Sequence, residues 1–132
     1  MNSEGAKLRF FLDEGVPNSV GRTLEEFGHT VVYGNKTLTP STPDLVVCLI
    51  SMTDGAILVA MDKDMKRIAK ENGVSNSQFA KLSFVHLDCF EIDAANRVRQ
   101  AMGLLEYEWE QSAGAVRRLH LVIGAGVIRT HR

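Results

Sequence analysis

The sequence predicts an α/β fold with a mostly parallel sheet, and three observations lead to it. Short runs of β-branched and other apolar residues alternate with stretches of helical periodicity. Each helical stretch can serve as a right-handed crossover between parallel strands. A length of 132 residues with 45% hydrophobic and 23% charged residues suits one globular domain. We expect a single domain over residues 1–132, with residues 1–6 disordered.

The first half of the chain is predicted to hold three strands and two helices. The strands are expected in the apolar runs over residues 8–12, 29–33 and 56–60. The first helix opens near Pro17, a residue that the first turn tolerates, and stops at Gly28. The second opens at Thr42-Pro43-Asp44, which supplies a cap, a first-turn proline and an acid near the positive end of the helix dipole, and it runs to about Met52. Residues 34–41 are predicted to form a loop.

The second half is predicted to hold two helices, a strand and a terminal hairpin. Asp64 is expected to cap a short basic helix over residues 65–70. A polar loop is expected over residues 72–78 and a strand over residues 82–87. A long helix over residues 93–111 and a glycine-turn hairpin over residues 119–129 follow. The core stripe of the long helix consists of Ile92, Ala95, Val98, Met102, Leu105 and Trp109. The hairpin would extend one edge of the sheet or pair with a second copy in a homodimer.

The charge is unevenly distributed along the chain. The net charge is −1, but residues 1–64 carry 5 Lys/Arg and 9 Asp/Glu (5 − 9 = −4), and residues 65–132 carry 10 and 7 (10 − 7 = +3). An acidic pocket beside a basic half suits a phosphate backbone held near metal ions. Solvated surface charge on both halves is an equally good interpretation.

Cysteine content and hydropathy exclude several classes of protein. Cys48 and Cys89 form neither a disulfide framework nor a zinc motif, and we interpret Cys48 as a small core residue. No apolar run approaches the length needed to span a bilayer, and no signal segment is found. A cytoplasmic location without a membrane partner is therefore expected.

Acidic residues directly follow two of the apolar runs. Asp13 and Glu14 close the first run, and Asp62 and Asp64 close the run that ends at Met61. Open α/β sheets bind their ligands beyond the carboxyl ends of the strands. Carboxylates that meet there repel one another and cost desolvation energy unless a hard cation such as Mg²⁺ or Mn²⁺ neutralises them. The pattern therefore favours a divalent-metal site at this edge of the sheet.

Four segments carry a resemblance to a known family. They are Leu12-Asp13-Glu14, Gly28-His29-Thr30-Val31-Val32, Ser41-Thr42-Pro43-Asp44 and Leu58-Val59-Ala60-Met61-Asp62-Lys63-Asp64. In this order and at these spacings they resemble the PIN-like superfamily, in particular its short bacterial branch with the pattern LDEN…GHDV…SDEE…TRDKDF. The closing hairpin, which ends in Ile128-Arg129, is also similar to that branch, so the resemblance covers nearly the whole chain.

The resemblance implies a three-layer α/β/α PIN-like fold with a C-terminal β-hairpin, and a divalent-metal nuclease that acts on RNA. Many relatives in the family are toxins of toxin–antitoxin pairs, so RNA and a cognate antitoxin protein are the implied partners. The positions that match the family's acids are Asp13, Glu14, Asp44, Asp62 and Asp64. The four aspartates would be catalytic and would bind Mg²⁺ or Mn²⁺, with Glu14 as a supporting metal ligand. Such a ribonuclease needs no protein nucleophile, because the cation activates water.

Each of these acids also has a purely structural interpretation. Asp64 could only cap a helix, and Asp44 could only complement a helix dipole. Asp62 could be a turn residue, and Glu14 could simply face solvent. Asp13 has the weakest structural alternative, because no helix begins directly after it.

Departures from the family pattern support a second hypothesis. Gly15 stands where the family has Asn, Ala60-Met61 stand where it has Thr-Arg, and Met65 stands where it has Phe. A threonine hydroxyl and an arginine near the metal could orient water or hold phosphate. The alternative is therefore a catalytically weak or silent PIN-like module that binds a partner protein. A phosphatase ranks third, because Asp13-Glu14-Gly15 lacks the Asp-x-Asp nucleophile pattern.

Other residue patterns carry less weight. His29 and His86 fall in predicted strands, and we interpret them as hydrogen-bonded structural residues. The basic face of Lys66, Arg67 and Lys70 could meet RNA phosphates but is more typical of a solvated helix. No GxSxG, GxxxxGK[ST] or GxGxxG motif occurs, which argues against α/β-hydrolase, P-loop and dinucleotide-binding functions.

Overall fold

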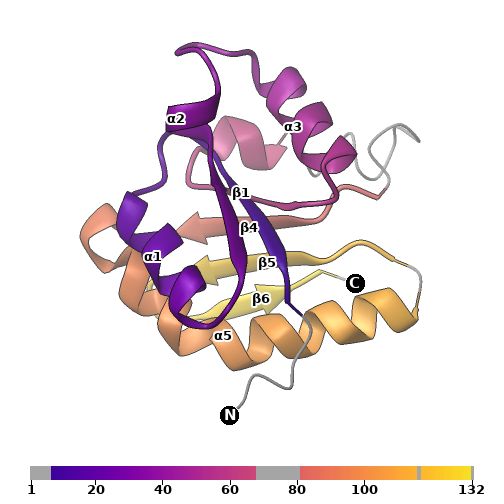
Figure 1. Cartoon of the computed structure of the whole chain (residues 1–132). Coiled ribbons are helices and arrows are strands. Elements are labelled where there is room, and N and C mark those ends of the chain that lie inside the picture. The colour runs from indigo at the N-terminus through magenta and orange to yellow at the C-terminus, as the bar shows by residue number, and fades with distance from the viewer. Residues whose placement is uncertain (1–6, 68–80, 116, 132) are drawn as a thin grey trace.

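The computed structural model of the chain describes residues 7–67, 81–115 and 117–131 (Figure 1). In chain order its elements are β1 Arg9–Leu12, α1 Asn18–Glu26, β2 Thr30–Tyr33, α2 Gly34–Thr37, α3 Asp44–Thr53, β3 Ile57–Ala60, β4 Phe84–Asp88, α5 Glu91–Gly114, β5 His120–Gly124 and β6 Ile128–Thr130. Residues 63–67, between β3 and β4, are also helical. The predictions for residues 1–6, 68–70 and 72–78 lie outside the described residues.

The described strands form one six-stranded sheet in the order β2-β1-β3-β4-β5-β6. All neighbouring strands are parallel except β5 and β6, which pair antiparallel with Val122 opposite Arg129. Every residue of β3 is buried, as is typical of a strand that helices cover on both sides. The structure confirms the predicted α/β class and mostly parallel sheet, and the terminal hairpin extends one edge of that sheet.

Helices cover both faces of the sheet. On one face, Val20 and Leu24 of α1 and Val98 of α5 contribute to the larger core. On the other face, Val47 and Cys48 of α3 belong to a second, smaller core. Figure 1 shows α5 running along one side of the strands while α3 lies on the opposite side. The arrangement is compatible with three α/β/α layers.

Some elements differ in extent from the predictions. The predicted loop over residues 34–41 contains the short helix α2, which follows β2 without a break. Helix α5 is longer than predicted at both ends, and Glu91 and Asp93 place favourable negative charge in its first turn. Ile92, predicted for the core stripe, is 90% exposed, because burial along α5 begins only at Ala94.

The helix caps also differ from the predictions. Pro43 rather than Thr42 occupies the N-cap of α3, and the Thr42 hydroxyl donates instead to the carbonyl of Thr39 at 2.6 Å. Asp62, not Asp64, caps the helix at residues 63–67, because Asp62 Oδ1 accepts the N–H of Asp64 at 2.8 Å. The predicted stop of α1 is confirmed at Gly28, which adopts φ +88°.

The cysteines and the hydropathy of the helices agree with the predictions made from the sequence. Both cysteines are free, and Cys48 is fully buried in the core as predicted, while Cys89 is partly buried. Across residues 7–67, 81–115 and 117–131, no helix combines the length and the apolarity that crossing a bilayer requires.

Candidate acidic site at the carboxyl edge of the sheet

The backbone brings Asp13 and Asp62 to the same edge of the sheet. β1 and β3 are parallel neighbours, with Leu12 opposite Val59. The N–H of Asp13 donates to the Val59 carbonyl at 2.9 Å, which extends the pairing by one residue and holds Asp13 against β3. Asp62 follows the last residue of β3 by two positions. Both carboxylates therefore lie beyond the carboxyl ends of adjacent strands, as the sequence predicts.

Asp44 approaches this edge from a separate part of the chain. It is the first residue of α3 and supplies the acidic charge of its first turn. A small recess of about 10 Å³ connects the two regions, because residues of β1, α2 and α3 line it together: Phe11, Asp13, Glu14, Gly34, Leu38, Thr39, Thr42 and Val47. The start of α3 thus lies next to the end of β1.

Burial and charge repulsion raise the pKa of two of these carboxyl groups. The pKa of Asp13 is raised mainly by its half-burial, and further by the charges of Asp44, Glu14 and Asp62, against an opposing hydrogen bond from the Glu14 backbone. The pKa of Asp44 is raised by burial first and then by the charges of Asp62, Asp64 and Glu14. Each of the five predicted acids therefore takes part in one cluster of mutually repelling charges.

Asp62 and Asp64 also have structural roles at the helix that follows β3. Both side chains are exposed. Asp62 caps the helix, and Asp64 Oδ1 lies 3.7 Å from the guanidinium of Arg67, an exposed ion pair worth under about 1 kcal/mol. Capping and metal binding are compatible, because a carboxylate has two oxygens and more than one lone pair on each.

The acidic cluster fits a hard cation in its chemistry, but its side chains are spread apart. All donors are carboxylate oxygens, the ligands that Mg²⁺ prefers. Within the part of the chain that the structure describes, however, no three Asp, Glu, His or Cys side chains form a group that could hold one metal ion. A cation would have to draw these carboxylates together, and three of them, Glu14, Asp62 and Asp64, are exposed.

Cys48 lies under the acidic cluster, and its thiol is unreactive. Burial, together with the charges of Asp44 and Asp13, raises the pKa of its thiol to about 12. Its Sγ contacts the sulfur of Met65 at 3.6 Å inside the core. The thiol therefore stays protonated at neutral pH and is neither a nucleophile nor a thiolate ligand.

The two histidines expected to be structural behave differently. His29 meets the expectation, because its Nδ1 accepts the N–H of Leu8 at 3.1 Å and its Nε2 lies 2.7 Å from Glu106. His86 does not. It is 1% exposed on β4, opposite Ala60, and within the described part of the chain neither ring nitrogen has a hydrogen-bond partner. Sequence reasoning missed this residue because periodicity indicates burial but not hydrogen bonding.

The surroundings of His86 make the fold sensitive to acid. Burial, and secondly the charge of Lys66, lowers the pKa of His86 in the folded state, against smaller opposing effects from the Met61 backbone and nearby carboxylates. The ordinary pKa of a histidine is about 6.5. Below that pH, His86 binds a proton in the unfolded chain but stays neutral in the folded chain until its lowered pKa is reached. Stability is therefore expected to fall as the pH drops from 6.5 toward the lowered pKa.

Replacing His86 with leucine is expected to stabilise the fold by about 1 kcal/mol at neutral pH, because two unpaired buried nitrogens are removed at similar volume. The gain grows as the pH is lowered below 6.5. Urea denaturation at pH 7.5 and 5.5 measures both effects. His29→Leu is the matched control and is expected to destabilise, because the N–H of Leu8 loses its acceptor. Equal stability of His86→Leu and wild type at both pH values would contradict this account.

The fold and site define an α/β protein with clustered carboxylates at the carboxyl edge of a mostly parallel sheet. Comparisons with protein families, with curated proteins and with solved structures found no match.

Proposed function

We propose that the chain is a divalent-metal-dependent ribonuclease of the PIN-like type, as its sequence resemblance implies. The observation that carries the proposal is the acidic cluster, in which burial first and the neighbouring carboxylates second raise the pKa of Asp13 and Asp44. Three separate segments of the chain supply these charges at one edge of the sheet. Such crowding costs stability unless it serves a ligand of opposite charge. The PIN-like fold and a role as the toxin of a toxin–antitoxin pair belong to the same proposal.

In this proposal Asp13, Asp44, Asp62 and Asp64 hold Mg²⁺ or Mn²⁺, and Glu14 supports them. A bound cation would generate hydroxide from water near neutral pH and would neutralise charge on the phosphate. Asp13 is held against β3, because its backbone N–H donates to the carbonyl of Val59. The exposed position of Asp62 leaves the outer side of the cluster open to an RNA phosphate.

The proposal is tested by incubating the purified chain with single-stranded RNA. Cleavage is expected in the presence of millimolar Mn²⁺ or Mg²⁺, is lost when EDTA is added, and returns when Mn²⁺ is restored in excess. Persistence of cleavage in EDTA would rule out the metal mechanism. Absence of cleavage at millimolar Mn²⁺ would favour the alternative below.

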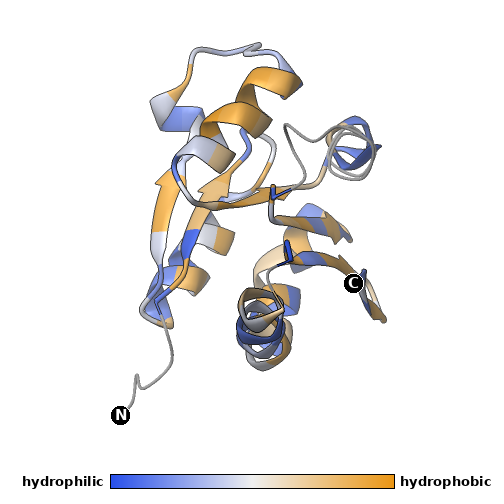
Figure 2. Cartoon of the chain, turned by 90° about the vertical axis from the view of Figure 1, so that its right-hand side faces the viewer, coloured by the Kyte–Doolittle hydropathy of each residue, from blue (hydrophilic) through white to orange (hydrophobic). Residues whose placement is uncertain are grey.

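The alternative is a catalytically silent PIN-like module that binds a partner protein. The observation in its favour is an apolar surface on α3, next to the acidic cluster, made by Leu45, Val46 and Leu49, each at least 40% exposed. Figure 2 shows α3 among the most hydrophobic helices of the structure. Calorimetry with Mn²⁺ discriminates the two functions, because this alternative predicts no metal binding together with retained binding of an antitoxin-like protein.

A further inference from the structure

A basic cavity lies at the opposite edge of the sheet from the acidic cluster. It has a volume of about 200 Å³ and is lined by Lys81, Ser83, Trp109, Ser112, Arg117 and Arg118, among others. Ser83 immediately precedes β4, and the two arginines precede β5, so the cavity lies at the amino end of these parallel strands. The five residues of β4 separate the two edges by about 16 Å at about 3.3 Å per residue. The cavity is thus distinct from the acidic site.

The lining is strongly positive. Lys81, Arg117 and Arg118 come from two segments of the chain, and no Asp or Glu is among the described lining residues. Arg118 is half-buried, and burial lowers its pKa. Glu108 and Glu110 flank Trp109 in α5, and neither is among the described lining residues. Nη2 of Arg118 lies 3.5 Å from Nδ1 of His120. Lys81 and Arg117 add two further positive charges to the lining, and this charge would attract an anion.

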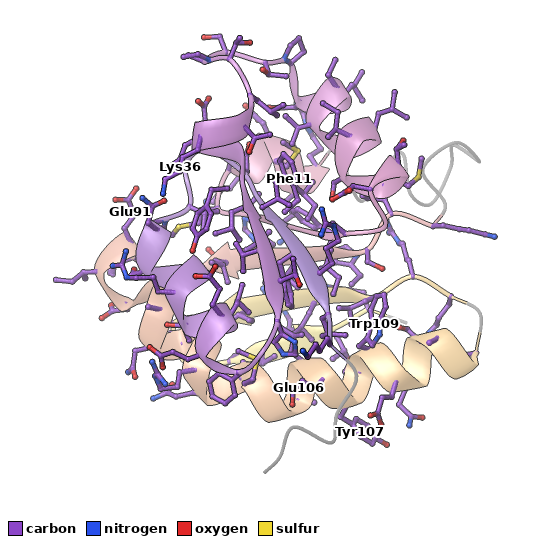
Figure 3. The ribbon with its side chains drawn as sticks, in the orientation of Figure 1. Phe11, Lys36, Glu91, Glu106, Tyr107 and Trp109 are labelled. Atoms are coloured by element: carbon purple, nitrogen blue, oxygen red, sulfur yellow. The ribbon has the colours of Figure 1, made fainter. Side chains whose placement is uncertain are left out.

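Trp109 gives the cavity one flat, apolar wall. Its side chain is partly buried, packs against the larger core and lines the cavity at the same time. Figure 3 shows Trp109 on the sheet side of α5, whereas Tyr107 points away from the sheet. The predicted core role of Trp109 is therefore only part of its environment. An indole that lines a cavity together with arginine side chains can offer a nucleobase a stacking surface.

Hydrogen bonds hold the polar part of the lining in place. The Ser83 hydroxyl accepts the N–H of Leu119 at 3.1 Å and can still donate its own proton. The Ser112 hydroxyl donates to the Trp109 carbonyl at 2.8 Å, which ties the last turns of α5 together. A fixed hydroxyl donor and planar arginine forks are the groups that bind a phosphate oxygen well.

We propose that this cavity binds the phosphate of a nucleotide, with the base stacked on Trp109. The ligand is a phosphate monoester that carries a flat ring, either a free nucleoside monophosphate or the phosphorylated end of an RNA strand. Binding needs no metal ion and does not depend on the function proposed for the acidic cluster.

Tryptophan fluorescence tests this proposal directly, because Trp109 is the only tryptophan in the chain. Adenosine 5′-monophosphate is titrated into the full chain in EDTA, which keeps metal-dependent binding at the acidic cluster out of the measurement. A saturable change in Trp109 emission is expected. Arg117→Gln is expected to weaken binding about tenfold, as the loss of one charged hydrogen bond does, and Lys81→Gln by a few fold.

The control is Arg99→Gln, which removes the same charge from α5 at a surface pair with Glu26 and leaves the cavity intact. Lys81 is exposed, so Lys81→Gln keeps the test valid if Arg117→Gln fails to fold. A second ligand, a 5′-phosphorylated oligoribonucleotide, identifies the source of the phosphate. Tighter binding of a 5′-phosphorylated oligoribonucleotide supports an RNA end, and equal binding supports a free nucleotide.

Three results would overturn the proposal. The first is no saturable change in emission up to about 10 mM adenosine 5′-monophosphate. The second is unchanged affinity in both the Arg117→Gln and Lys81→Gln variants. The third is equal affinity for inorganic phosphate and for the nucleotide, which would remove the role assigned to Trp109.

Discussion

Asp13→Asn is expected to reduce metal-dependent RNA cleavage by at least about 100-fold while raising the thermal stability of the protein. Asparagine keeps the shape of the side chain but removes the charge that would bind the cation. The same change relieves a repulsion, because burial and neighbouring carboxylates raise the pKa of Asp13 in the fold. Because the pKa of Asp13 is raised in the folded state, the wild type loses stability as the pH rises from the ordinary carboxyl pKa through the raised value. Asparagine does not ionise, so the variant does not lose this stability.

Cleavage of single-stranded RNA with Mn²⁺ and the melting temperature at pH 7 measure the two effects together. Asp54→Asn is the matched control, because the Asp54 carboxylate forms an exposed ion pair with Arg9 at 2.7 Å and lies outside the acidic cluster. That control is expected to cleave RNA like the wild type. Full activity in Asp13→Asn would remove Asp13 from the mechanism, and a lowered melting temperature would contradict the repulsion.

Gly34→Ala is expected to destabilise the fold by about 2–3 kcal/mol and to impair the acidic site as well. Gly34 is the first residue of α2 and is buried against the end of β1. A Cβ at this position would overlap the carbonyl oxygen of Leu12 and would press on the ring of Phe11 at 3.2 Å. Because Leu12 O belongs to backbone, the clash is relieved only by moving the chain just before Asp13.

Urea denaturation measures the stability of this variant, and Gly103→Ala provides its control. Gly103 lies in α5, where an added Cβ meets nothing within 4 Å, so alanine there is expected to stabilise by about 0.5–1 kcal/mol. Gly34→Ala with wild-type stability would show that the end of β1 is less tightly packed than the structure indicates.

The sheet is predictable from the sequence because its strands are buried on both faces. Such strands appear as short apolar runs, and the helical stretches between them indicate parallel pairing. The position of the acidic cluster follows from the same logic, since Asp13 and Asp62 come directly after neighbouring strands. The stop of α1 at Gly28 also agrees with the structure, whereas the N-cap of α3 is Pro43 rather than Thr42.

Details that depend on side-chain geometry could not be predicted. Both Asp62 and Asp64 can cap the helix that follows β3, and only the hydrogen bond at 2.8 Å identifies Asp62 as the cap. The exposure of Ile92 depends on where α5 meets the core, which its periodicity alone does not determine. The unpaired nitrogens of His86 and the cavity beside Trp109 arise from segments far apart in sequence, and only the folded chain brings these segments together.

Anomalous diffraction from a crystal soaked in millimolar Mn²⁺ tests the central claim most directly. The account predicts a manganese peak at the carboxyl edge of the sheet, within bonding distance of carboxylate oxygens of Asp13 and Asp62, with Asp44 beside it. It also predicts that the same soak of Asp13→Asn crystals gives no peak there. Wild-type crystals without a peak at this edge, or with manganese bound only elsewhere, would contradict the account.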